Sequence, residues 1–349
     1  MSKSNHVHMP QANELSNETK ASMRTRIISA IVCVAIILPL LFLGDISFLV
    51  LMVFLLAAAV FEIIHCAKTK YSIWLYIVSF IFAFVIAFWP IFYNLFLTGT
   101  GKMFFNGVQI KLPDWHLFTG FNGLGVPITA LILGATVLFF MVVADANFEV
   151  RDACFIFTMI LIISLGIQSI TFIRFIPLYE RFYIQGTSFK YFSSFNIFQS
   201  TLLVIYVCIA TFLTDIGAYF VGVFFGKNKM NPRISPKKTW EGFFGGLIIS
   251  TGLSFLFAFI LALNKCPILS FLDMEHWYII LALSIIIPPI SVLGDFVFSS
   301  IKRYYGIKDF SRLIPGHGGI LDRLDSIIFS FLFAALLVSL VIYWEALVA

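Results

Sequence analysis

The chain has little charge and few cysteines for its length. Only 12% of its 349 residues are charged, whereas 60% are hydrophobic, and the mean hydropathy is +0.99. Repeated apolar runs of about 20 residues place such a chain among membrane proteins rather than soluble ones. The five cysteines form no CxxC pair, and four lie in or beside apolar runs. The sequence therefore predicts neither a disulfide framework nor a zinc site.

The N-terminus lacks the features of a cleaved signal. The first 22 residues are polar, and the first apolar run starts near Ile27. No small-residue cleavage site follows Leu41–Asp45, so we expect a retained helix instead of a signal peptide. Residues 1–24 are predicted to be a disordered cytoplasmic tail, residues 25–198 a set of N-terminal transmembrane helices, and residues 199–349 a C-terminal catalytic region.

Hydropathy predicts an all-α, polytopic integral membrane protein. We expect nine spans, at residues 27–44, 46–66, 72–97, 125–144, 153–173, 199–224, 242–263, 278–300 and 326–346. The aromatic connections 98–125 and 171–198 are expected to lie in the interface or to dip into the bilayer.

Positive charge is distributed unequally between the two sides. With the N-terminus in the cytoplasm, 17 of the 23 Lys and Arg residues fall on the cytoplasmic side. This bias supports an odd number of spans and places both polar motif segments, 226–242 and 299–325, on the cytoplasmic face. The membrane is either a bacterial plasma membrane or a eukaryotic internal one.

Four acids lie within or at the ends of predicted spans, where a charge is costly. Glu62 and Asp145 can be helix-end residues that reach water, and this interpretation suits Asp145 best. Asp215 and Asp295 each lead directly into a cationic segment. Pro288-Pro289 precedes Asp295 and should break or kink its helix, freeing carbonyl groups near the acid.

The first motif segment, residues 226–242, is rich in lysine. Ser235-Pro236 is expected to form a turn. Lys237, Lys238 and Thr239 would then stand at a helix N-terminus, which suits an anion. The spacing of a Walker A loop is absent. The alternative is a cationic anchor of the positive-inside kind.

Glycines flank this segment on both sides, at Gly222, Gly226, Gly242 and Gly246. They can be close-packing positions between two helices.

The second segment, residues 299–325, concentrates charge between two apolar runs. Asp295, Ser299 and Lys302 share one face of a continued helix, as do Asp322 and Asp325. Carboxylates that converge repel one another unless a cation lies between them, and Mg²⁺ binds through one or two carboxylates and substrate phosphates.

His317 lies among glycines in this segment, at Gly316, Gly318 and Gly319. Glycine permits a positive φ and a close approach of the backbone to a ligand. A histidine there can be a ligand, an acid/base or a hydrogen-bond donor to phosphate. The alternative for the whole segment is a salt-bridged connector.

The run Ser299–Asp325 resembles the signature of the phosphatidate cytidylyltransferase (CDP-diacylglycerol synthase) family, without a departure. Two further stretches also resemble the sequence of that family: Asp215 with Ala218-Tyr219, and the run from Ser235 to Gly242. The resemblance covers roughly residues 200–345. It implies transfer of CMP from CTP to phosphatidate, giving CDP-diacylglycerol and pyrophosphate in phospholipid biosynthesis.

On that reading, CTP, phosphatidate and the lipid bilayer are the partners, no nucleic acid is involved, and a homodimer is left open. Magnesium, alone or with a second cation, would be held by Asp295, Asp322 and Asp325. The catalytic set would be these three acids with Lys302 and His317. The substrate-binding set would comprise Asp215, Ser235, Lys237, Lys238, Thr239, Glu241, Ser299, Arg303, Lys308, Asp309, Gly318, Gly319 and Arg323. Among these, Arg323 would also brace the carboxylates.

Two other functions are compatible with parts of the sequence. A CTP-dependent polyprenol or dolichol kinase also joins a CTP site to a lipid acceptor, but the full Ser299–Asp325 pattern argues against it. A secondary transporter would use intramembrane acids to couple ions to an anionic substrate. It would be expected to show paired repeats and a midplane site, whereas here no repeat is visible and the polar motifs lie at one face.

Overall fold

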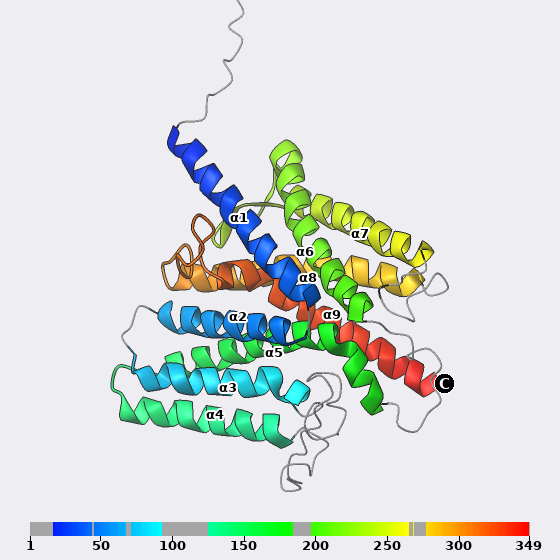
Figure 1. Cartoon of the computed structure of the whole chain (residues 1–349). Helices are drawn as coiled ribbons and strands as arrows, with labels where there is room; N and C mark the ends of the chain where they lie inside the picture. The colour runs from blue at the N-terminus through cyan, green and yellow to red at the C-terminus, as the bar shows by residue number, and fades with distance from the viewer. Residues whose placement is uncertain are drawn as a thin grey trace, which may run out of the picture.

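The protein is a bundle of long helices with one short hairpin, seen here in a computed structural model (Figure 1). The structure describes residues 17–43, 45–67, 71–92, 125–183, 197–264, 268 and 277–348. Its elements are α1 (Asn17–Leu43), α2 (Asp45–His65), α3 (Ile73–Phe92), α4 (Gly125–Ala144), α5 (Val150–Tyr183), α6 (Ile197–Phe225), β1 (Lys229–Asn231), β2 (Ser235–Thr239), α7 (Trp240–Leu263), α8 (Trp277–Tyr304) and α9 (Leu321–Val348).

The described ranges contain nine helices that are long and apolar enough to cross a membrane, with mean hydropathies from 1.9 to 2.7. The prediction of an all-α, multi-pass membrane protein is therefore confirmed, with the β1–β2 hairpin as a small departure. The backbone is already helical at Asn17, within the segment predicted to be disordered. Of the two aromatic connections, 98–124 and 184–196 lie outside the described residues.

The helices pack in two groups. Helices α2, α3, α4 and α5 contact one another, as do α6, α7, α8 and α9, and α5 joins the groups by packing on both α6 and α9 (Figure 1). Helix α5 changes direction at Phe175, where φ is −108° and ψ is 16°. Helix α2 also reaches α9, so the start of α9 lies where the two groups meet.

Helices α6 and α7 approach each other through small residues. A Cβ atom on Gly246 would lie 2.6 Å from the Thr214 carbonyl oxygen, and one on Gly242 would lie 2.7 Å from that of Ala218. Larger side chains cannot occupy these positions without separating the helices. The predicted close-packing role of the glycines is confirmed.

Helix α8 continues through Pro288-Pro289, so the predicted break does not occur. Proline has no N–H, and Pro288 therefore leaves the Ser284 carbonyl without its helical partner. The Thr251 hydroxyl of α7 donates to this carbonyl at 3.0 Å. The neighbouring helix thus satisfies the freed group, and α8 runs on to Tyr304 with Asp295, Ser299 and Lys302 on one face.

Candidate functional site

Asp295 on α8 is held by two neighbours. The Ser299 hydroxyl, one turn further on, donates to Asp295 Oδ1 at 2.9 Å. The Lys238 ammonium, from β2, lies 2.5 Å from Asp295 Oδ2. The two predicted motif segments are therefore brought together at this carboxylate.

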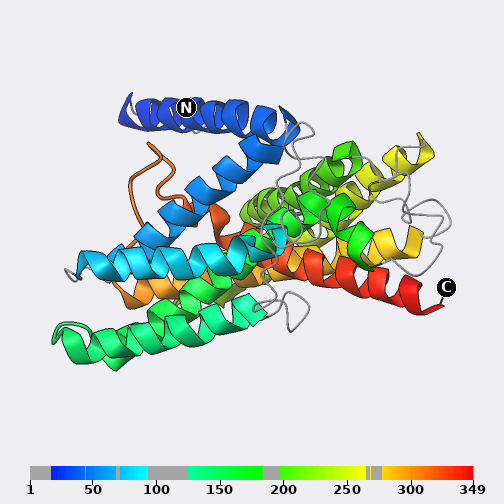
Figure 2. The ribbon, with the colours of Figure 1, turned by 60° about the horizontal axis from the view of Figure 1, so that its bottom comes forward.

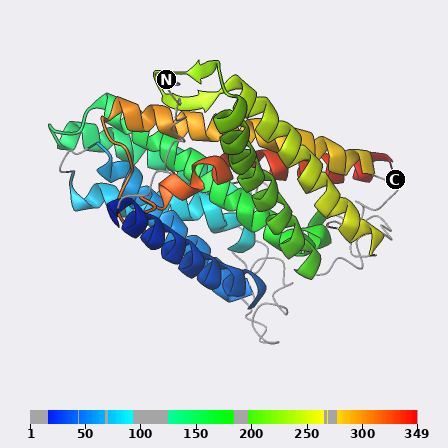
Figure 3. The same cartoon turned by 90° about the horizontal axis from the view of Figure 1, so that it is seen from above.

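The hairpin that delivers Lys238 differs from the prediction. Ser235 and Pro236 are the first residues of β2, and the turn falls at residues 232–234 instead (Figure 3). Strand β2 pairs with β1 in the antiparallel sense. A five-residue strand rich in lysine carries no alternation of apolar residues, so the sequence pattern could not indicate it.

The end of the hairpin is fixed by two side chains. Thr239 is the N-cap of α7, as the sequence suggested, and its hydroxyl accepts from the Gly242 N–H at 3.1 Å. The Glu241 carboxylate accepts from the backbone N–H groups of Lys227 and Asn228, at 3.1 Å each. Thr239 and Glu241, both predicted to bind substrate, are here engaged in holding the hairpin.

Asp322, in the first turn of α9, is enclosed by donors. Its Oδ1 accepts from the Lys302 ammonium at 2.8 Å, and its Oδ2 accepts from the N–H groups of Phe310 and Gly319, each at 2.9 Å. Asp322 is 7% exposed and Lys302 8% exposed. A buried ion pair is stable only when such additional hydrogen bonds satisfy it. Asp322 therefore ties the end of α8, the connecting loop and α9 together.

Three other carboxylates interact through space. Asp325 lies on α9, one turn after Asp322, with its Oδ2 at 3.9 Å from the Lys302 ammonium. Its charge interacts with those of Asp295 and Asp215. Asp215, on α6, interacts with Lys238 and Asp295 and makes no hydrogen bond in the described part of the chain. We call Asp215, Asp295 and Asp325, with Lys238 and Lys302, the carboxylate centre.

Among the described residues, no three acids or histidines are spaced as a ready-made metal cluster. The predicted ligands Asp295, Asp322 and Asp325 are therefore not gathered as one set. Mg²⁺ needs only one or two carboxylates in addition to water and substrate phosphates. Asp295 and Asp325 fit this need because their charges repel each other and their partners are lysines. Metal binding by Asp322, which stays a prediction, would cost it a hydrogen bond.

The loop between α8 and α9 passes beside α1 and α2, as the orange segment in Figure 2 shows. Gly316 and Gly318 have φ values of +76° and +86°. Ile314 and Gly318 exchange two backbone hydrogen bonds, of 2.8 and 3.1 Å, around the turn that carries His317. Positive φ favours glycine, so the predicted reason for these two glycines is confirmed.

Glu62, at the end of α2, caps α9 from another helix. Its Oε1 accepts from the Ile320 N–H at 2.9 Å and the Ser311 hydroxyl at 2.6 Å, and its Oε2 accepts from the Leu321 N–H at 2.7 Å. The side chain is 2% exposed. The carboxylate thereby satisfies N–H groups at a helix start and complements the helix dipole.

The sequence showed Glu62 only as an acid late in a span. Gly319 allows its approach, because a Cβ atom there would lie 2.5 Å from Glu62 Oε2. Acids in apolar spans signal a functional or structural partner, but no local spacing pointed to one more than 250 residues away.

His317 contacts α1. Its Nδ1 lies 2.7 Å from the Ser29 hydroxyl, which itself donates to the Arg26 carbonyl at 3.0 Å. With that hydroxyl hydrogen used, Nδ1–H is the donor and Nε2 is left as an acceptor. Partial burial and the charges of Arg323 and Arg26 hold the pKa of His317 below its usual value. The imidazole is therefore neutral at pH 7.

Arg323 contacts the loop directly, whereas it interacts with the carboxylates only through space. Its Nε and Nη2 donate to the His317 carbonyl at 3.1 and 2.9 Å, while its charge interacts with that of Asp215. The predicted bracing of carboxylates is thus limited to this interaction through space.

A cavity of about 640 Å³ opens between this loop and α1. It brings together five predicted site residues, Lys308, Asp309, His317, Gly318 and Arg323, and adds Arg26 and Arg312, which the sequence analysis did not single out. Two arginines from outside the predicted set make the cavity strongly cationic. Such a surface favours phosphate groups.

Three predicted residues lie apart from both places. Arg303 lines a different cavity, on the far side of α8. Lys237 is exposed on β2, and Ser235 is half-buried at its start.

The chain is similar in sequence to proteins that are already known. The sequence profile of the family described as "Cytidylyltransferase family" matches residues 24–341. Proteins named phosphatidate cytidylyltransferase are similar to parts of the chain. The one from Bacillus subtilis is 40% identical over 157 residues, which cover 44% of this chain and 55% of that protein. The one from Haemophilus influenzae is 43% identical over 130 residues, covering 37% and 43% respectively. The one from Mycobacterium leprae is 46% identical over 120 residues, covering 34% and 35%. The matches thus span about half or less of the relatives' own lengths.

Proposed function

Because the chain belongs to the cytidylyltransferase family, we propose that it transfers CMP from CTP to phosphatidate, giving CDP-diacylglycerol and pyrophosphate. The observation that carries this proposal is the carboxylate centre. Asp215, Asp295 and Asp325 come from three membrane-spanning helices and face two lysines, next to a cavity lined by cations. This arrangement suits a reaction in which only phosphate groups change.

The chemistry asks the protein mainly to position and neutralise charge. Phosphatidate is a phosphate monoester with a second pKa of about 6, so an oxygen of the dianion can attack the α-phosphorus of CTP without a strong general base. The P–O bond to the β-phosphate breaks and pyrophosphate leaves with the bonding electrons. Lys238 and Lys302, which pair with acids in the structure, are placed to contact the phosphates. Such positioning and charge stabilisation supply most of the rate in phosphoryl chemistry.

We assign Mg²⁺ to Asp295 and Asp325, with Asp215 as a further oxygen donor. When bound, the ion neutralises phosphate charge and polarises the bond to be broken. The cation-lined cavity beside His317 would take the pyrophosphate portion of CTP, with Lys308 and Arg323 as hydrogen-bond donors. We place the centre on the cytoplasmic face, because the positive-inside bias orients both motif segments there.

The test is cytidylyl transfer in detergent micelles. Purified full-length protein receives CTP labelled at the α-phosphate, phosphatidate and Mg²⁺, alongside Asp295→Asn. We expect label in a lipid product, which disappears without Mg²⁺ and in the variant. If label stays in water-soluble species although phosphatidate is present in the micelles, the assignment is wrong. Movement of γ-label to a polyprenol would indicate the kinase alternative.

A further inference from the structure

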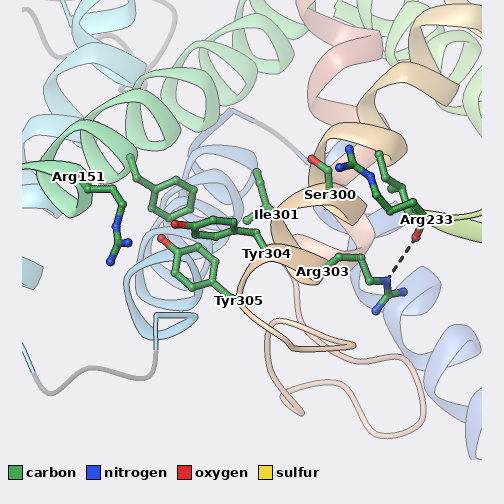
Figure 4. A pocket seen from close by; sticks show the side chains of 9 residues that line it. Arg151, Arg233, Ser300, Ile301, Arg303, Tyr304 and Tyr305 are labelled. Atoms are coloured by element: carbon green, nitrogen blue, oxygen red, sulfur yellow. Dashed lines mark hydrogen bonds between the residues drawn. The ribbon is translucent and has the colours of Figure 1, made fainter.

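A second cavity lies on the other side of α8 from the carboxylate centre. Its volume is about 620 Å³, and it lies between the start of α5, the turn of the hairpin and the end of α8 (Figure 4). Ser300, Arg303 and Tyr304 line it. With 100° between successive residues, Ser300 and Tyr304 point away from the face of α8 that carries Asp295 and Lys302, and Arg303 lies at the side of that face.

Three guanidinium groups from three different segments line this cavity, those of Arg151, Arg233 and Arg303. Arg303 is held in place, because its Nε donates to the Ile234 carbonyl at 3.3 Å (Figure 4). Its Nη1 also donates to the Ile307 carbonyl at 3.2 Å. Each arginine has five N–H donors, so donors of Arg303 remain available.

The other two arginines are less engaged. Arg151 lies 3.5 Å from Glu149 and 3.8 Å from Asp152, and its side chain is 67% exposed. Arg233, at the hairpin turn, makes no hydrogen bond or ion pair with any described residue. Such loosely paired guanidinium groups repel one another unless an anion lies between them, and a phosphate fits their planar forks.

Aromatic rings form part of the remaining wall, beside Ile234, Ser300 and Ile301. The rings of Phe155 and Tyr305 have centroids 5.1 Å apart, and those of Tyr304 and Tyr305 are 5.0 Å apart. Burial raises the pKa of Tyr305, which keeps its hydroxyl protonated as a hydrogen-bond donor. Tyrosines of this kind concentrate at the membrane–water boundary, where one end is apolar and the other is wet.

The ends of the neighbouring membrane spans also place the cavity at the membrane–water boundary. The span of α5 begins at Val150 and the span of α8 ends at Tyr304. Arginines there meet the phosphate layer of the bilayer, while Phe155 and the tyrosines can contact the adjoining glycerol and acyl groups.

We propose that this cavity is an accessory binding site for an acidic phospholipid, whose headgroup phosphate is held by Arg151, Arg233 and Arg303. It is a binding site only, and none of its lining residues is a carboxylate that would repel the phosphate. A lipid is favoured over a nucleotide because the wall combines cations with rings at the level of the bilayer surface. The site does not depend on the reaction proposed above.

Native mass spectrometry of the full-length protein, without CTP, tests this site. The probes are phosphatidylglycerol, zwitterionic phosphatidylcholine and inorganic phosphate at equal concentration. We expect retention of phosphatidylglycerol in preference to phosphatidylcholine, with no displacement by inorganic phosphate. Arg151→Gln and Arg233→Gln should each weaken this retention about tenfold, the effect of removing one charge-assisted hydrogen bond.

Lys229→Gln is the matched control, since Lys229 is an exposed cation of the same hairpin that does not line the cavity. It should retain the lipid as the wild type does. An unchanged melting temperature of Arg233→Gln, whose side chain is exposed, excludes misfolding as the cause. Equal retention of both lipids, equal loss in the control, or displacement of the lipid by inorganic phosphate would overturn the proposal. Because no turnover is measured, either result leaves the cytidylyltransferase proposal untouched.

Discussion

Two groups of acids near the start of α9 have opposite surroundings: Glu62 and Asp322 are buried, whereas Asp295 and Asp325 are half-buried and Asp215 is exposed. Glu62 accepts hydrogen bonds from two backbone N–H groups and from the Ser311 hydroxyl. Asp322 accepts from two backbone N–H groups and from the Lys302 ammonium. These two acids hold the loop and the start of α9. Asp215, Asp295 and Asp325 face one another and two lysines. The first group is satisfied by the fold itself. We propose that an added cation and phosphates complete the second.

On this proposal, the difference separates residues that build the site from residues that act in it. Removing an acid of the first group should lower stability first and activity as a consequence. Removing an acid of the second group should lower activity while relieving repulsion in the folded protein.

The largest expected effect is a loss of CMP transfer in the Asp295→Asn variant. The amide keeps the shape but loses the charge that attracts Lys238 and a metal ion. We expect a fall in kcat on the order of 10³-fold, comparable to the loss of a central electrostatic group. Steady-state transfer with labelled CTP checks the rate, and thermal unfolding in the same detergent should show little change in stability. A variant that retains near-normal kcat would remove Asp295 from the centre.

Glu62→Gln should instead reduce stability. One oxygen of the amide can still accept, but the NH₂ group would face the Leu321 or Ile320 N–H, leaving a buried donor unsatisfied at a cost of about 1–3 kcal/mol. Glu149→Gln is the matched control, because the Glu149 side chain forms only an exposed pair with Arg151 and such pairs contribute little. Unfolding curves of the two variants should differ clearly. Equal curves would contradict the capping role.

Gly319→Ala tests the same contact from the other side. Its methyl group would lie 2.5 Å from Glu62 Oε2, and the carboxylate cannot move without losing its hydrogen bonds. We expect a loss of about 1–3 kcal/mol, as for overpacking at a buried position. Gly252→Ala, where a Cβ atom meets nothing within 4 Å, should be neutral or slightly stabilising. Thermal melts of both proteins measure the contrast.

The smallest expected effect concerns pH at His317. Its pKa is lowered in the folded protein, mainly by partial burial and then by Arg323 and Arg26, so the unfolded chain binds the proton more readily. The contribution of the neutral imidazole is therefore complete above its ordinary pKa of about 6.5 and is lost as the pH falls below that value. His317→Gln should remove this slope from melting temperature plotted against pH. An identical slope in the variant would show that another group titrates.

Much of the centre could be predicted because helical spacing is a local property. The i, i+4, i+7 arrangement of Asp295, Ser299 and Lys302 and the i, i+3 arrangement of Asp322 and Asp325 are present, since α8 extends to Tyr304 and α9 starts at Leu321. The preference of threonine for the position before a helix also placed Thr239 at a helix start.

What the sequence could not predict depends on contacts between distant segments. Lys302 was expected to act with Asp295 but pairs with Asp322 of the next helix. Glu62 and Ser29 reach the loop from helices far away in the chain, and Arg303 turns to the other side of α8. No periodicity encodes which helices become neighbours, and hydrophobic patterns of membrane spans are too uniform to specify it.

The most direct test of the division between the two groups is the Mg²⁺ dependence of transfer in Asp325→Asn and Asp322→Asn, each measured on the folded fraction. The account predicts that Asp325→Asn loses transfer or needs at least about tenfold more Mg²⁺ for half-maximal rate, the effect of one ligand. Asp322→Asn should unfold more easily but keep the wild-type Mg²⁺ requirement. The reverse pattern, with the Mg²⁺ requirement changed only in Asp322→Asn, would show that Asp322 holds the metal and would contradict the account.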